Sequence, residues 1–150
     1  MYTLTIASGF INIQDTVLDN LQSVQVTGVV FANEMGHVAI HAAGKSIMLH
    51  PTLIDSINGA DIDGESIDEI IAIMQVASIL PSGSGSLDII EVTASAGIVL
   101  EAEELLGKTV HVVFLNNIAA TRGFALASTT ITFSDGTAFA GGETVKILVS

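Results

Sequence analysis

Alternation of apolar and polar residues with a period of two is the feature of this sequence that most limits its fold. Near the N-terminus Tyr2, Leu4 and Ile6 are separated by threonines, and Ile11 and Ile13 flank an asparagine. This spacing places the apolar side chains on one face of an extended strand. Glycines or small polar residues bound each such stretch, as is typical of short strands joined by turns. We expect about nine strands, over 2–6, 11–13, 24–30, 37–41, 45–49, 87–93, 109–115, 124–133 and 144–149.

One segment, at about 66–80, instead has the pattern of an α-helix. Ser66 and Glu69 form a capping-box pair, in which each side chain accepts a hydrogen bond from the other residue's backbone amide. Pro81 ends the helix, because proline has no amide to donate and its ring clashes with the preceding turn. Apolar residues cover more than half of the helix circumference. We therefore expect it to be enclosed by its own sheets or shared with a neighbouring chain.

These patterns predict a mainly β fold, a β-sandwich or small barrel of short antiparallel strands, with one packed α-helix. A second, short helix is expected over 101–106, closed by Gly107. The Gly- and Ser-rich segment 81–86 is expected to be a loop, because the composition does not change across it. The length fits a single β-rich domain, 1–150.

Charge excludes several classes of partner. The chain has 16 acidic and only 4 basic residues, a formal net charge of −12. Phosphate binding needs clusters of Lys and Arg, so we expect no nucleic-acid partner and no attraction to an anionic membrane surface. The longest apolar run, 70–80, is shorter than the about 20 residues that span a bilayer, and the first residues lack a signal-peptide pattern. The basic residues are scattered: Lys45, Lys108, Arg122 and Lys146.

Hydrophobic residues make up 49% of the chain. A domain of this length buries about 68–70% of the surface that its unfolded chain exposes, and its core is not expected to hold all of them. We expect the surplus to be buried between subunits, since obligate interfaces are more apolar than ordinary surface. The alternative is a larger core with alanines spread over the outside. The chain has no cysteine, which excludes disulfides, thiolate catalysis and Cys-based zinc sites.

The four histidines do not form a metal-binding pattern. His37 and His41 lie four positions apart on a predicted strand, which separates their Cα atoms by about 13 Å. They do not share one ion at that distance, and His50 and His111 can join either of them only through the fold. The chain has no HExxH sequence and no His-rich tract. We expect ordinary surface or half-buried histidines.

The segment Asp61–Glu65 resembles the opening of a calcium loop, because acidic residues alternate along it. The twelfth position of that pattern is Ala72, where a bidentate glutamate is required. A solvated acidic turn that leads into the helix is the better interpretation.

No catalytic motif is present in the sequence. Ser84 lies in the Gly- and Ser-rich segment without the strand-turn-helix context of a nucleophilic serine. Glu104 and Lys108 have the spacing of an ion pair on a surface helix, not that of an acid/base dyad. P-loop and GxGxxG sequences are absent. We expect neither enzymatic activity nor a cofactor.

The C-terminal segments Ser128–Thr137, Ala138–Gly141 and Val145–Val149 resemble the end of lambda-type phage head decoration proteins. Those proteins are small and β-rich, and they trimerise on the outside of a capsid. The resemblance implies that residues 1–13 form an N-terminal arm, in which Tyr2–Ile13 contacts the shell. It also implies that the C-terminal hairpin belongs to the folded body.

We therefore expect a non-enzymatic structural subunit of a virus particle, a phage capsid decoration or cement protein that stabilises the shell. It would be assembled in the host cytoplasm and located in the virion. Its expected partners are further copies of itself, as a trimer, and a major capsid or other virion protein. One alternative is a phage tail-tube or neck subunit, and another is a small-ligand or metal-binding β domain. The candidate contact residues are the apolar ones of the first strands and the helix: Tyr2, Leu4, Ile6, Ile11, Ile13, Ile70, Ile73, Val76 and Leu80.

Overall fold

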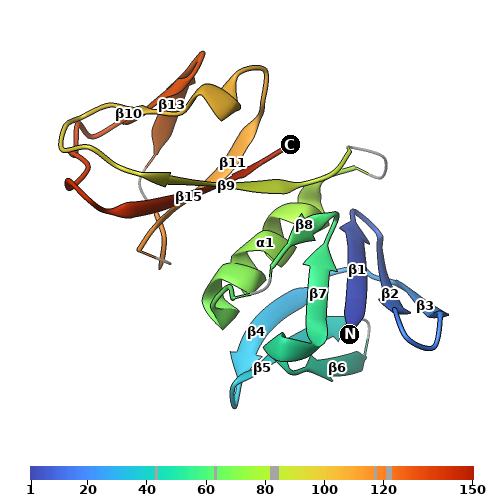
Figure 1. The fold of residues 1–150 in the computed structure, drawn as a ribbon. Coiled ribbons are helices and arrows are strands. Elements are labelled where there is room, and N and C mark those ends of the chain that lie inside the picture. The colour runs from blue at the N-terminus through green and yellow to red at the C-terminus, as the bar shows by residue number, and fades with distance from the viewer. Residues whose placement is uncertain (43, 63, 82–84, 117, 121–122) are drawn as a thin grey trace. The chain divides into compact units, whose positions relative to one another are not determined.

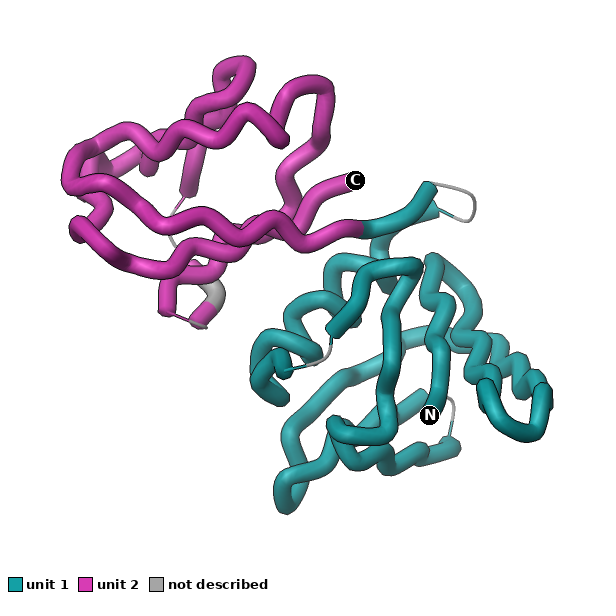
Figure 2. Tube along the Cα trace, in the orientation of Figure 1, with its two compact units in different colours: residues 1–87 teal, residues 88–150 magenta. Residues whose placement is uncertain are grey.

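The computed structural model describes residues 1–42, 44–62, 64–81, 85–116, 118–120 and 123–150. Figure 1 labels the elements. Contacts between residues divide the chain into two compact units, Met1–Leu87 and Asp88–Ser150 (Figure 2). The sequence predicts one domain because nothing in its composition changes at residue 87. The boundary follows directly after the Gly- and Ser-rich segment that we expected to be an internal loop.

Unit 1 contains two sheets in its described residues. The first is mixed and has the order β3-β2-β1-β7-β8, with β1 antiparallel to β2 and parallel to β7. The second is an antiparallel meander, β4-β5-β6. The strands are β1 (Tyr2–Ala7), β2 (Phe10–Asp15), β3 (Asn20–Gln25), β4 (Val30–Glu34), β5 (His37–Ala42), β6 (Lys45–Leu49), β7 (Ile54–Ile57) and β8 (Ala60–Asp61), with a 3-10 turn at Pro51–Leu53.

The first strand is a central element of unit 1. Leu4 faces Ile13 across the β1–β2 ladder and Ile6 faces Ile11, and all four side chains are buried. Because β1 has a partner strand on each side, its backbone groups are satisfied within the unit. The resemblance implies an N-terminal arm at residues 1–13. In the structure these residues belong to the core strands β1 and β2 and do not form a free arm.

The predicted helix is confirmed as α1 (Ile67–Ile79). Ser66 Oγ accepts a hydrogen bond from the Glu69 amide at 3.2 Å, and Glu69 Oε1 accepts one from the Ser66 amide at 3.1 Å. This capping box contributes about 1 kcal/mol to helix stability. The helix packs against β1, β4 and β5, which accounts for apolar residues on several of its sides.

Unit 2 contains two further sheets in its described residues, in the orders β12-β11-β15-β9 and β10-β14-β13. Their inner faces share one hydrophobic core, in which the rings of Phe133 and Phe139 stack at 4.9 Å. The strands are β9 (Asp88–Thr93), β10 (Leu100–Glu101), β11 (Val110–Leu115), β12 (Ile118–Ala119), β13 (Phe124–Ala127), β14 (Thr130–Phe133) and β15 (Thr144–Val149).

The mainly β fold with one α-helix is confirmed, although the strands are shorter and more numerous than predicted. Left-handed residues divide two of the predicted strands. Gly28, at φ +63°, separates β3 from β4, and Ser128, at φ +59°, turns residues 124–133 into a hairpin. The second predicted helix is wrong in length, because only the 3-10 turn Glu103–Leu105 forms before Gly107.

Asn58 joins β1 to β7 through three hydrogen bonds. The Ile6 amide donates to Asn58 Oδ1 at 2.7 Å, and Asn58 Nδ2 donates to the Ile6 carbonyl at 2.8 Å. The Asn58 amide donates to the Leu4 carbonyl at 2.9 Å. Asn58 has a φ of +51°, a left-handed conformation that asparagine tolerates better than most residues. Its side chain therefore continues the β1–β7 ladder past the end of β7.

We expect Asn58→Ala to lower the free energy of unfolding of unit 1 by about 2–5 kcal/mol. The change removes two side-chain hydrogen bonds, each worth about 0.5–1.5 kcal/mol, and places alanine in a left-handed conformation that costs about 1–2 kcal/mol. Urea denaturation measures the loss. Asn116→Ala is the matched control, because Asn116 also has a positive φ, of +48°, but makes one exposed side-chain bond, to Glu143. Equal losses in the two variants would contradict the role of Asn58.

Candidate assembly surface

The turn and outer strand of the β2–β3 hairpin, residues 16–25, are exposed except for Val24. Its two strands pair without a register shift, from Phe10 opposite Gln25 to Asp15 opposite Asn20. The Asp15 carboxylate closes the turn by accepting hydrogen bonds from the backbone amides of Val17 and Leu18, at 2.8 and 3.2 Å. These two hydrogen bonds lower the pKa of Asp15, because they stabilise its charged form. The charged Asp15 carboxylate therefore stabilises this turn at neutral pH.

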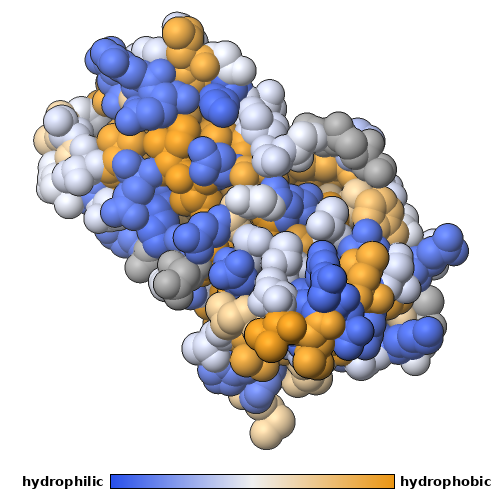
Figure 3. Space-filling model, turned by 45° about the vertical axis from the view of Figure 1, so that its right-hand side comes forward, coloured by the Kyte–Doolittle hydropathy of each residue, from blue (hydrophilic) through white to orange (hydrophobic). Residues whose placement is uncertain are grey.

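Apolar side chains gather at this tip. Val17, Leu18 and Leu21 are 80%, 67% and 61% exposed. Figure 3 shows apolar side chains, in orange, on the surface among polar ones. Exposed apolar residues that are scattered singly need no explanation, but three within five positions of one hairpin form a small exposed apolar cluster.

The outer strand of the hairpin lacks the features that normally protect a sheet edge. β3 is the last strand of its sheet (Figure 1). Charged residues, prolines and bulges usually prevent pairing at such edges, yet no charged residue or proline occurs between Asp19 and Glu34. The other six-residue edge strand of the described residues, β9, carries Asp88 and Glu91. The charge-free stretch is visible in the sequence, and it is the signal that our sequence-based choice of contact residues missed.

The hydrogen-bond pattern of the hairpin shows which backbone groups of β3 point outward. The Val26 amide donates to the Gly9 carbonyl at 3.0 Å. Residues of an antiparallel strand alternate between facing one neighbour and facing the other. Counting back from Val26, the even-numbered residues of β3 bond to β2. The amides and carbonyls of Leu21, Ser23 and Gln25 therefore face away from the sheet.

The described residues of unit 1 form pockets in at least two places. One, of about 300 Å³, lies beneath the hairpin and is lined by polar groups of Asp15, Asn20 and Gln22 together with residues of β1 and β6. The other, of about 380 Å³, lies at the end of β1 beside Asn58 and Leu80. Both are at the small end of the range for ligand sites.

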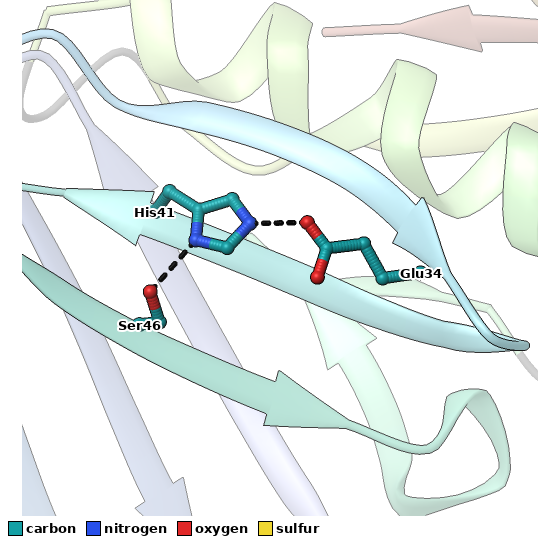
Figure 4. Close-up of polar contacts among 3 residues, drawn as sticks. All are labelled: Glu34, His41 and Ser46. Carbon is teal, nitrogen blue, oxygen red and sulfur yellow. Dashed lines mark hydrogen bonds and ion pairs between the residues drawn. The ribbon is translucent and has the colours of Figure 1, made fainter.

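A polar network lies on the β4-β5-β6 sheet (Figure 4). His41 Nδ1 is 2.7 Å from Ser46 Oγ, its direct neighbour across the β5–β6 ladder, and His41 Nε2 is 2.6 Å from Glu34 Oε1. The His41 and Glu34 side chains are 37% and 46% exposed. Serine, imidazole and carboxylate in line are the residue types of a hydrolase triad.

The surroundings of this network favour a structural role. A triad works beside a pocket that holds substrate and donors for an oxyanion. None of Glu34, His41 and Ser46 lines the pocket beneath the hairpin or the pocket at the end of β1. The network instead ties β4 and β6 to β5, next to the turn at Met35 and Gly36, where both residues have a positive φ.

The fold brings His50 to His37, which the sequence left open. Their rings meet edge to face with centroids 5.3 Å apart. His111 Nε2 lies 2.8 Å from Ser150 Oγ, and partial burial lowers the pKa of His111. Within the described parts of the chain, no three His, Asp or Glu side chains are grouped so that they could hold a metal ion.

Most of the contact residues predicted from the sequence are core residues. Strand pairing on both sides of β1 and packing of α1 on β1 remove their side chains from the surface. Tyr2, Val76 and Leu80 are half-buried, and Tyr2 and Leu80 line the two pockets. The buried members are Leu4, Ile6, Ile11, Ile13, Ile70 and Ile73.

Three residues that the sequence singled out lie outside the described residues: Asp63 of the acidic turn, Ser84 and Arg122. At the two ends of that turn, Asp61 closes β8 and the Glu65 amide donates to the Ile62 carbonyl at 3.0 Å.

Comparisons of the chain with protein-family models, with curated proteins and with solved structures found no match. Among the residues that the structure describes, no helix has both the length and the apolar character needed to cross a membrane.

A double-mutant cycle tests the structural role of the His41 network. We expect Glu34→Ala and His41→Ala to be coupled by about 0.2–1 kcal/mol in free energy of unfolding, as for other exposed pairs. Urea denaturation of the two single variants, the double variant and the parent chain measures it. A coupling energy of zero would contradict the interaction.

Proposed function

We propose that this protein is a non-enzymatic structural subunit of a virus particle, a capsid decoration protein that binds further copies of itself and a shell protein. It acts by adhesion: its surfaces bridge neighbouring subunits, and no reaction takes place on it. Its location is the virion, and it needs neither a cofactor, a nucleic acid nor a membrane.

The observation that carries this proposal is the open edge of β3. Main-chain pairing at a sheet edge gives affinity without a preformed pocket, and soluble monomers usually block it. Here the edge is six residues long and uncharged, and an exposed apolar tip adjoins it. A chain with a net charge of −12 repels its copies in general, so a charge-free edge is the place where they can approach.

The assignment to a virus particle is supported by the C-terminal resemblance alone. Its segments fall on β14, on the turn that follows and on β15. A tail-tube or neck subunit would use the same kind of edge, and it stays the alternative within this class.

The two pockets favour a second candidate, a small-ligand-binding β domain. The pocket beneath the hairpin combines the carboxylate of Asp15 with the amides of Asn20 and Gln22, and a few polar groups in a partly apolar pocket are typical of ligand sites. A protein that serves this function would not depend on self-association.

Fractionation of the cells that produce the protein tests the proposal. On a density gradient, we expect the full chain to sediment with intact virus particles, and light scattering of the purified chain to give trimers or larger assemblies. A protein that stays in the soluble fraction as a monomer at every concentration would contradict the structural function and support the ligand-binding candidate.

A further inference from the structure

We infer that β3 pairs with β3 of a second copy of this chain, antiparallel and about a two-fold axis at Ser23. This inference rests on the proposed self-assembly and names the surface and the register that produce it. The pairing would make one continuous sheet from the five-stranded sheets of two copies.

The distribution of charged residues around β3 indicates that the strand that pairs with it comes from a second copy of the chain. Asp15 and Asp19 border the strand at one end, and the next charged residue after them is Glu34. When two copies meet antiparallel, the acidic end of each β3 lies beside the uncharged segment that follows β3 in the other. No acid then faces an acid, so the net charge of −12 does not oppose this approach. A basic partner would find no carboxylate within β3 itself.

The register follows from the faces of the strand. A two-fold axis between neighbouring antiparallel strands is perpendicular to the sheet, so each residue faces one whose side chain lies on the same face. The outward backbone groups belong to Leu21, Ser23 and Gln25, which share a face. Pairing Ser23 with its own copy and Leu21 with Gln25 uses all of these groups. The register centred on Gln22 instead sets Gln25 against Asp19, outside the strand.

The same register has a consequence for the apolar tip. Leu21 of each copy lies opposite Gln25 of the other, and the tip of each hairpin extends toward the turn at Gly28 of the other copy. The interaction that satisfies the backbone of the edge therefore also covers part of the exposed Leu21 side chain.

Single cysteines test the register directly, because the chain has none of its own. In the proposed dimer the two Ser23 Cα atoms lie about 5.5 Å apart, within the range that a disulfide bridges. We expect Ser23→Cys to form a covalent dimer under mild oxidation, which a reductant reverses. Gln25→Cys is the matched control, since Gln25 is exposed on the same face but lies about 14 Å from its copy.

A second pair of variants tests the hydrogen bonds. The Ser23 amide faces outward, so Ser23→Pro removes a donor from the edge without removing one from the β2–β3 ladder. We expect the Ser23→Pro variant not to assemble through β3, and the Ser23→Ala variant to assemble like the parent chain. Circular dichroism checks that both variants are folded.

The outcomes separate the two proposals. If the parent chain is oligomeric but Ser23→Cys gives no more covalent dimer than Gln25→Cys, the β3 pairing is wrong while self-assembly stands. If β3 instead pairs with a strand of a different protein, purified Ser23→Cys does not form a covalent dimer. Particles that contain Ser23→Pro then lack that other protein. If the parent chain is a monomer throughout, both proposals fail.

Discussion

The backbone groups of a strand bond to neighbouring strands or, at the edge of a sheet, to water, and the architecture of this protein follows from which strands have a neighbour on both sides. β1 has β2 on one side and β7 on the other, with Asn58 extending the second ladder by means of its side chain. An apolar strand with two neighbours becomes a core strand, which is why the first residues are not free to act as an arm. β3 is an edge strand that is six residues long and carries no charge, and this combination is the basis of the function that we propose.

The many hydrophobic residues of the chain are divided between the core and the surface. Many of the apolar side chains fill the cores of the two units, including those of β1, β2 and α1 that we expected at a subunit interface. A smaller set is exposed, and three of its members, Val17, Leu18 and Leu21, lie at the tip of the β2–β3 hairpin. Burial between subunits therefore remains a prediction, but its expected place has moved from the terminal strands to this hairpin.

Local signals in the sequence predicted local structure well. The capping pair Ser66 and Glu69 marked the start of α1, and period-two alternation marked β1, β2, β5, β6, β11 and β15. Long-range features had no such signal. The parallel pairing of β1 with β7 joins residues about fifty positions apart, and the approach of His50 to His37 depends on how the meander folds. The contact residues were misplaced for a related reason, because apolar alternation identifies a buried face without showing what buries it.

The most direct test of the open edge is residue-resolved hydrogen exchange of the β3 amides at a concentration where the protein is assembled. If the edge pairs with a second copy, the outward amides of Leu21, Ser23 and Gln25 exchange as slowly as those of Gln22 and Val24, which bond to β2. If the edge stays open, slow and fast amides alternate along the strand. The first result is the one that we predict, and the alternating pattern would contradict the central claim.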